Sequence, residues 1–280
     1  MYSSTDDTFI DKGFVKLLPH RDEDQVNLDV NRSFVYYPAN ISNSKKLQLC
    51  KLLSQTIIKI LRKFQNLSYF QGYHDIVSIF LLNFIKVNHQ NNSKIASKSQ
   101  SDDEDDDVLD QVDNISELDM AIQRFTLHRI RDSLYTDLSP IMGYLHFTQI
   151  ILSLERPDLA SVVALTSDLP IFSLSWILTL TSHDLTSFET VSRLFDFLIC
   201  HDPIMICYLA SAICLTKEKE IEELMHEARA AGEEIDLDMV HFVMSKLPVL
   251  VLEEGSGKEK GESSVEPILE DSEQSKENEY

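Results

Sequence analysis

The stretch from residue 44 to residue 64 carries apolar residues at intervals of three and four, which is the period of one face of a helix. These positions are Cys50, Leu53, Ile57, Ile60, Leu61 and Phe64. Ser44 stands ahead of them and can cap the first turn, because serine oxygens accept hydrogen bonds from the amides of a helix N-terminus. The pattern predicts a helix from Ser44 to about Phe64.

Capping residues predict where two later helices begin. Ser139 before Pro140 is typical of an N-cap followed by a first-turn proline, in a helix that runs to about Leu154. Thr186 and Glu189 have the spacing of a capping box, in which each side chain accepts a hydrogen bond from the backbone of the other residue.

Four more segments are assigned from composition and helix breakers. Asp202 followed by proline predicts a helix start. Residues 217–231 are predicted to be helical, as is a shorter segment from Asp236 or Asp238 to Lys246. Residues 76–85 contain aromatic and β-branched side chains that also suit a strand, but no strand partner lies near them in the sequence. We therefore expect a buried helix there, and an all-α fold.

Shifts in composition divide the 280 residues into a polar N-terminus (1–17), one folded domain (18–252) and an acidic tail (253–280). An acidic insert (88–115), with an unbroken acidic run at 102–107, interrupts the domain. Such segments bury too little apolar surface to offset the entropy of ordering them. We therefore expect the insert and the tail to be disordered.

Charge and the length of apolar runs exclude two kinds of partner. The net charge is −21, most of it in the insert and the tail, and no basic stripe is present. A polyanionic surface repels phosphate backbones, so nucleic acid is excluded. The longest apolar runs, at 169–180 and 203–215, are shorter than the about 20 residues that a membrane span needs. We therefore expect no membrane-crossing segment.

The sequence contains none of the common motifs for catalysis by the chain itself. GxSxG, HExxH and GxGxxG are absent, and the nine histidines and four cysteines show no metal-ligand spacing. We therefore predict no metal site, and reduced cysteines in a cytosolic compartment.

Two short segments remain as candidates for chemistry. In the first, Asp29 and Arg32 stand three residues apart, so that on a helix the carboxylate can hold the guanidinium. In the second, the YFQG segment that begins at Tyr69, glycine permits a tight turn that leaves the Gln71 amide exposed. Taken singly, each fits an ordinary structural role better: a surface ion pair, and a loop that joins two helices.

Together, the two segments resemble the arginine-finger (I/V-x-x-D-x-x-R) and glutamine-finger (Y-x-Q-G) motifs of the TBC-domain Rab GTPase-activating proteins. The similarity covers about residues 18–250 apart from the insert, and it includes Trp176 and an R-L-F-D element at 193–196. The YFQGYHDIV stretch looks like the subgroup that acts at the endoplasmic reticulum to Golgi step.

The resemblance implies a two-lobed, all-α domain that accelerates GTP hydrolysis by a bound Rab-family GTPase. Arg32 and Gln71 would be the catalytic residues: Arg32 neutralises charge on the phosphate oxygens and Gln71 orients the attacking water. Asp29 would position Arg32. Tyr69 and Gly72 would shape the turn at Gln71. The Rab would carry GTP and Mg²⁺, so the chain would need no cofactor of its own.

Some family features have no counterpart in this sequence. Residues 1–19 do not match the family's N-terminal helix, Phe195 replaces a tryptophan, and an acidic tail stands where members of the subgroup often have a membrane anchor. We therefore expect a cytoplasmic protein whose association with endoplasmic reticulum or Golgi membranes is at most peripheral. Two alternatives stay open: a helical scaffold that binds a Rab without accelerating hydrolysis, and an unrelated helical adaptor. The sequence names neither the Rab nor the oligomeric state.

Overall fold

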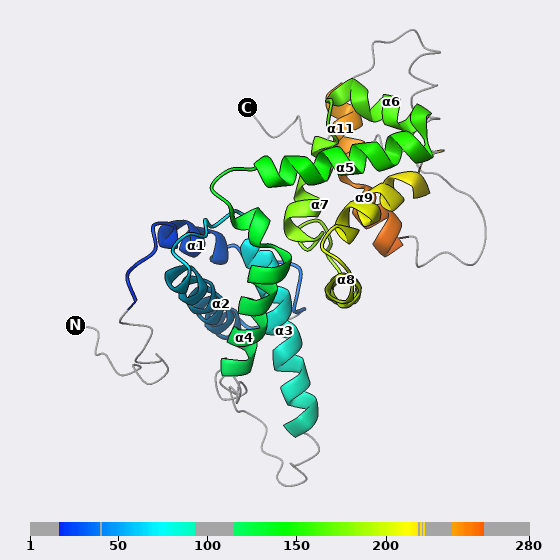
Figure 1. Ribbon diagram of the computed structural model, residues 1–280. Coiled ribbons are helices and arrows are strands. Elements are labelled where there is room, and N and C mark those ends of the chain that lie inside the picture. The colour runs from blue at the N-terminus through cyan, green and yellow to red at the C-terminus, as the bar shows by residue number, and fades with distance from the viewer. Residues whose placement is uncertain are drawn as a thin grey trace, which may run out of the picture.

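The computed structural model describes residues 17–39, 41–92, 115–217, 219, 221 and 237–254. All regular structure in these ranges is helical, which confirms the all-α prediction (Figure 1). The helices are α1 (Glu23–Val30), α2 (Asn43–Lys63), α3 (Tyr73–Asn92), α4 (Ile115–Arg129), α5 (Ser139–Glu155), α6 (Pro157–Thr166), α7 (Leu174–Thr179), α8 (Phe188–Cys200), α9 (Met205–Thr216), α11 (Leu237–Ser245) and α12 (Leu247–Val249). Short 3-10 helices lie at Arg131–Leu134 and Ile171–Ser173, and a π-helical turn lies at Leu250–Glu254.

The helices form two lobes (Figure 1). Helices α1 to α4 pack together in the N-terminal lobe, and α5 to α12 make up the C-terminal lobe. Helix α3 joins the two, because it contacts α1, α2 and α4 and also α7 and α8. The predicted two-lobed architecture is therefore confirmed, with α7 and α8 at the junction.

Burial of the apolar stripe explains why the α2 segment is helical. Leu53, Ile57 and Leu61 are fully buried, in a core that continues through α3 and α4 to Phe195 of α8. In the C-terminal lobe a second cluster packs around Trp176, whose ring centroid lies 5.4 Å from that of Phe172. Trp176 is 0% exposed, so it is a core residue of this lobe.

Four predicted helix starts are displaced by one to a few residues. Ser139 is the first residue of α5 and not its cap, because Leu138 occupies the N-cap position. Ser42 caps α2, two residues earlier than predicted, since its Oγ accepts a hydrogen bond from a backbone amide of the first turn (3.2 Å). The capping box at Thr186 is wrong: Ser187 caps α8, and the Thr186 hydroxyl donates instead to Glu253 (2.7 Å). Helix α9 begins only at Met205.

Helix α3 includes the ambiguous segment at 76–85, which is helical as predicted. The helix continues to Asn92, so residues 88–92 belong to it and the insert boundary predicted at residue 88 is wrong. Ile115, the last residue of the predicted insert, begins α4, whereas residues 93–114 and most of the predicted tail lie outside the described residues. Helix α11 confirms the helix predicted at 236–246, whereas most of the helix predicted at 217–231 also lies outside them.

Candidate functional site

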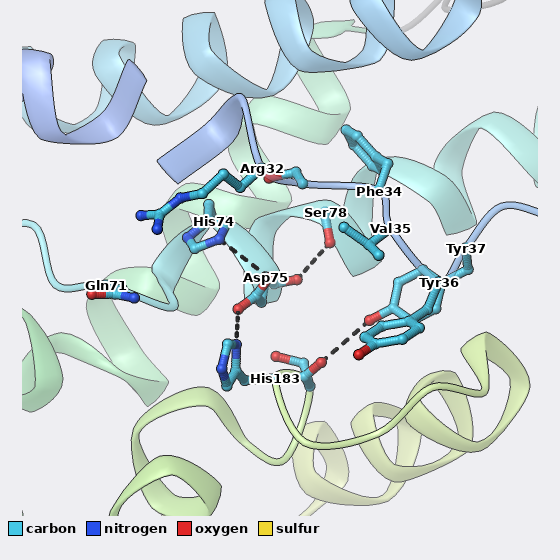
Figure 2. Close-up of a pocket in the computed structure, with 12 residues that line it drawn as sticks. Arg32, Phe34, Val35, Tyr36, Tyr37, Gln71, His74, Asp75, Ser78 and His183 are labelled. Atoms are coloured by element: carbon cyan, nitrogen blue, oxygen red, sulfur yellow. Dashed lines mark hydrogen bonds and ion pairs between the residues drawn. The ribbon is translucent and has the colours of Figure 1, made fainter. Parts of the chain in front are cut away.

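Arg32 and Gln71 line the same pocket, although they come from different segments of the chain (Figure 2). The pocket has a volume of about 260 Å³ and lies between the segment after α1, the start of α3 and the turn between α7 and α8. Its other lining residues are Ser33, Phe34, Val35, Tyr36, Tyr37, His74, Asp75, Ser78, Ser182 and His183. The structure thus brings together the two residues predicted to be catalytic.

Arg32 follows the C-terminus of α1 and is held by a buried carboxylate. Its Nη2 donates to Asp29 Oδ1 at 2.5 Å; the Asp29 side chain is 0% exposed, whereas that of Arg32 is 67% exposed. Gln25 Nε2 (3.1 Å) and the Tyr69 hydroxyl (3.0 Å) also donate to this carboxylate. A buried carboxylate is costly without such donors, so Asp29 restrains the guanidinium while most of the Arg32 side chain stays open to solvent.

Gln71 occupies the exposed corner of a tight turn. The Tyr73 amide donates to the Phe70 carbonyl (3.1 Å), and Gly72 has a φ of +112°, which residues with a side chain rarely adopt. A Cβ atom at Gly72 would lie 2.5 Å from Thr179 Cγ2, at the end of α7. Glycine is required here for both reasons, and the backbone of the turn packs directly against the C-terminal lobe.

The structure adds three residues that the sequence analysis did not select: His74, Asp75 and His183. His74 Nδ1 lies 3.0 Å from the Tyr69 hydroxyl, and its Nε2 lies 3.3 Å from Asp75 Oδ1. Asp75 Oδ2 pairs with His183 Nδ1 at 2.9 Å (Figure 2). A continuous chain of polar contacts therefore joins Arg32 to His183. His74 and Asp75 directly follow the selected segment, but nothing in the sequence around His183 marks it as part of a site.

Burial and charge set the protonation of these groups. Burial raises the pKa of Tyr69 far above its ordinary value, so the hydroxyl keeps its proton. Burial lowers the pKa of His74, so this imidazole is neutral at pH 7. The hydrogen bond to Asp75 raises the pKa of His183, which favours the imidazolium. Of the residues that line the pocket, Arg32 is therefore a permanent cation and His183 a titratable one.

This arrangement suits a ligand that another molecule presents to the pocket. A restrained, exposed guanidinium can bind phosphate oxygens, and a nearby carboxamide can hold a water molecule because it both donates and accepts hydrogen bonds. Across the described ranges, no group of three or more His, Cys, Asp and Glu residues is placed to hold a metal ion. No helix within these ranges is long and apolar enough to span a bilayer.

Comparisons with a family model and with known proteins all indicate the same family. The model of the Rab-GTPase-TBC domain matches residues 11–222. TBC1 domain family member 20 of Homo sapiens is 27% identical over 228 residues, which is 81% of this chain and 47% of that protein. GTPase-activating protein GYP8 of Saccharomyces cerevisiae is 28% identical over 232 residues, with 79% of this chain and 44% of that protein covered. The chain spans about half the length of the curated relatives it matches.

The fold also has counterparts among solved structures. The RabGAP TBC domain from the Chlamydomonas flagellum is 16% identical, with 83% of this chain and 66% of that chain covered, at a TM-score of 0.47.

Proposed function

Because the chain belongs to the Rab-GTPase-TBC domain family, we propose that it is a GTPase-activating protein for a Rab-family GTPase. Its similarity to TBC1 domain family member 20 and to GYP8 fits the subgroup that the YFQGYHDIV stretch indicates. By that kinship the protein acts at the endoplasmic reticulum to Golgi step.

One observation carries this proposal: the Arg32 guanidinium and the Gln71 carboxamide line a single open pocket, from separate segments of the chain. The bound Rab brings GTP and Mg²⁺ to this pocket. Arg32 then neutralises the charge that grows on the β- and γ-phosphate oxygens, and Gln71 orients the attacking water. A cation supplied in this way accelerates hydrolysis by about 10³ to 10⁵, which corresponds to roughly 4–7 kcal/mol of the barrier.

Asp29 contributes by restraining Arg32 before the Rab arrives. A free arginine side chain samples many rotamers, and ordering it on binding costs about 1.5–2 kcal/mol. The buried Asp29 carboxylate, with its donors from Gln25 and Tyr69, offsets part of this cost in advance. Tyr69 and Gly72 act at the other segment, where the left-handed Gly72 backbone exposes Gln71 at the corner of its turn.

Single-turnover GTP hydrolysis on a panel of purified Rabs tests the proposal. We expect Arg32→Ala and Gln71→Ala each to lower the stimulated rate by about 10² or more. Arg131→Ala and Gln65→Ala are matched controls, because both residues are exposed and neither lines the pocket. Equal rates for the wild type and both pocket variants would contradict the catalytic assignment. Binding of GTP-loaded Rab without any acceleration by the wild type would instead favour the scaffold alternative.

A further inference from the structure

The turn between α7 and α8 (residues 180–187) carries a residue of the C-terminal lobe into the pocket. Leu180 and Thr181 both have left-handed backbones, with φ values of 53° and 64°. Such a conformation is unfavourable for a β-branched residue and persists only where the surroundings enforce it. Here the Thr181 amide donates to the Trp176 carbonyl (2.9 Å) and the Ser182 amide to the Thr179 carbonyl (3.1 Å). The turn is therefore fixed by its own lobe, and it presents His183 from a defined place.

The last residue of α7 and the turn that follows it each touch the chain around Gln71. Thr179 Cγ2 packs against the α-carbon of Gly72, leaving no room for a side chain. His183 Nδ1 lies 2.9 Å from Asp75 Oδ2, and the Asp75 amide donates to the Gly72 carbonyl at 3.0 Å. Through these two contacts Asp75 links His183 to Gly72, the residue directly after Gln71.

A third contact ties the same turn to the segment that follows Arg32. The Tyr37 hydroxyl donates to the Ser182 carbonyl at 3.3 Å. Tyr37 and Arg32 both line the pocket, as do Ser182 and His183 (Figure 2). The turn of the C-terminal lobe is therefore in contact with both segments that bear the candidate catalytic residues.

We propose that His183 is a positioning residue: through Asp75 it holds the first turn of α3, and with it the turn that presents Gln71 to the Rab. This inference rests on the proposed function, because it assigns His183 a role in the same reaction. His183 does not act on the nucleotide itself. It supports the Gln71 carboxamide, whose contribution to the rate depends on its orientation. Displacement of a positioned group by about 1 Å can lower a rate by on the order of 10²-fold.

The charges around His183 give the contact a pH dependence. Two carboxylates face it: Asp75 from α3 and Asp184 from its own turn. His74 and Arg32 are the basic groups on the pocket side, and Lys246 acts on Asp184 from beyond α11. The hydrogen bond to Asp75 raises the pKa of His183. The ion pair between the His183 imidazolium and the Asp75 carboxylate therefore forms below that raised pKa and weakens as pH rises through it.

Steady-state kinetics with a Rab that the wild type activates tests this role. We expect His183→Ala to lower kcat by about tenfold while KM for the GTP-loaded Rab changes less than about twofold. His183→Gln keeps a neutral donor for Asp75, so it should restore most of kcat and remove the His183-dependent step from the pH profile. His146→Ala is the matched control, because His146 is exposed on α5 and does not line the pocket.

Hydrogen exchange in the free protein gives a readout that needs no Rab. The amides of Tyr73, Asp75 and Ile76 close the turn and the first turn of α3. We expect them to exchange up to about fivefold faster in His183→Ala than in the wild type or in His146→Ala, since removing the His183 contact lowers the local opening free energy by at most about 1 kcal/mol.

The two experiments separate failure of this inference from failure of the proposed function. Acceleration by the wild type together with an unchanged kcat and unchanged exchange in His183→Ala would overturn the inference and leave the proposed function intact. A rise in KM alone would also overturn it, because His183 would then contact the Rab directly. A wild type that activates no Rab would refute the proposed function, and the exchange rates would still decide whether His183 supports the turn.

Discussion

Replacing Gly72 by alanine tests the geometry on which the Gln71 turn depends. The new methyl group would lie 2.5 Å from Thr179 Cγ2, far inside van der Waals contact. Thr179 cannot easily turn this methyl group away, because its Oγ1 donates to the Ser175 carbonyl at 2.9 Å. Alanine would also have to adopt a φ of +112°.

Backbone strain of this kind costs about 1–3 kcal/mol, and overpacking a buried site costs about as much again. A single backbone shift would relieve part of both costs, so we expect Gly72→Ala to lower the free energy of unfolding by about 2–4 kcal/mol. We also expect loss of GTPase activation, since the shift that relieves the clash displaces Gln71.

Urea denaturation measures the effect, as a lower midpoint at an unchanged m-value. Gly143→Ala is the matched control: Gly143 lies on the exposed face of α5, and a Cβ atom there has no neighbour within 4 Å. That change should stabilise the protein by about 0.5–1 kcal/mol. Adding Thr179→Ser to Gly72→Ala removes the clashing methyl group and should recover part of the loss. If Gly72→Ala lies within about 0.5 kcal/mol of the wild type, the packing described for this turn is wrong.

Three further substitutions probe groups in and near the pocket. Asp29→Asn removes the buried charge that restrains Arg32, and Tyr69→Phe removes one of the hydrogen-bond donors to the Asp29 carboxylate. We expect each substitution to lower the free energy of unfolding by about 1.5–3 kcal/mol, as measured by urea denaturation. Asp29→Asn should reduce GTPase activation more than Tyr69→Phe does, as measured by single-turnover assays. Burial raises the pKa of Asp184 to about 6, so between the unfolded pKa of about 3.9 and this value the folded state binds the extra proton. The stability that Asp184 contributes should therefore be lost as pH rises from about 4 to 6, so the urea midpoint of the wild type should fall relative to that of Asp184→Asn over that range.

Local patterns predicted the helices well but not their first residues. The period of apolar positions identified α2, since a helix with one apolar face has few other ways to bury it. Which of two neighbouring hydroxyls caps α8 was decided elsewhere in the fold. Glu253 accepts hydrogen bonds from the Thr186 hydroxyl and amide, and Ser187 is left to cap the helix. No pattern within a short window contains that information.

The same distinction applies to the candidate site. The Asp29–Arg32 pair and the glycine turn at Gln71 are set by residues within a few positions of one another, so spacing alone suggested both. His183 meets Asp75 across 108 residues, and the meeting depends on how α7 packs against α3. The residues on either side of a histidine in a polar turn do not indicate such a contact, so only the three-dimensional structure reveals the His183–Asp75 pair.

The association of the two lobes does not depend on this exposed ion pair. Phe195 of α8 is buried, and its ring centroid lies 6.0 Å from that of Phe80 on α3 and 6.2 Å from that of Phe125 on α4. Burial of one such ring contributes about 1.5–3 kcal/mol, whereas a pair whose histidine is 57% exposed contributes at most about 1 kcal/mol. The aromatic junction therefore holds the lobes together, and the His183–Asp75 contact sets only the local orientation of the Gln71 turn. A weak, titratable contact can tune the site in this way because its loss does not separate the lobes.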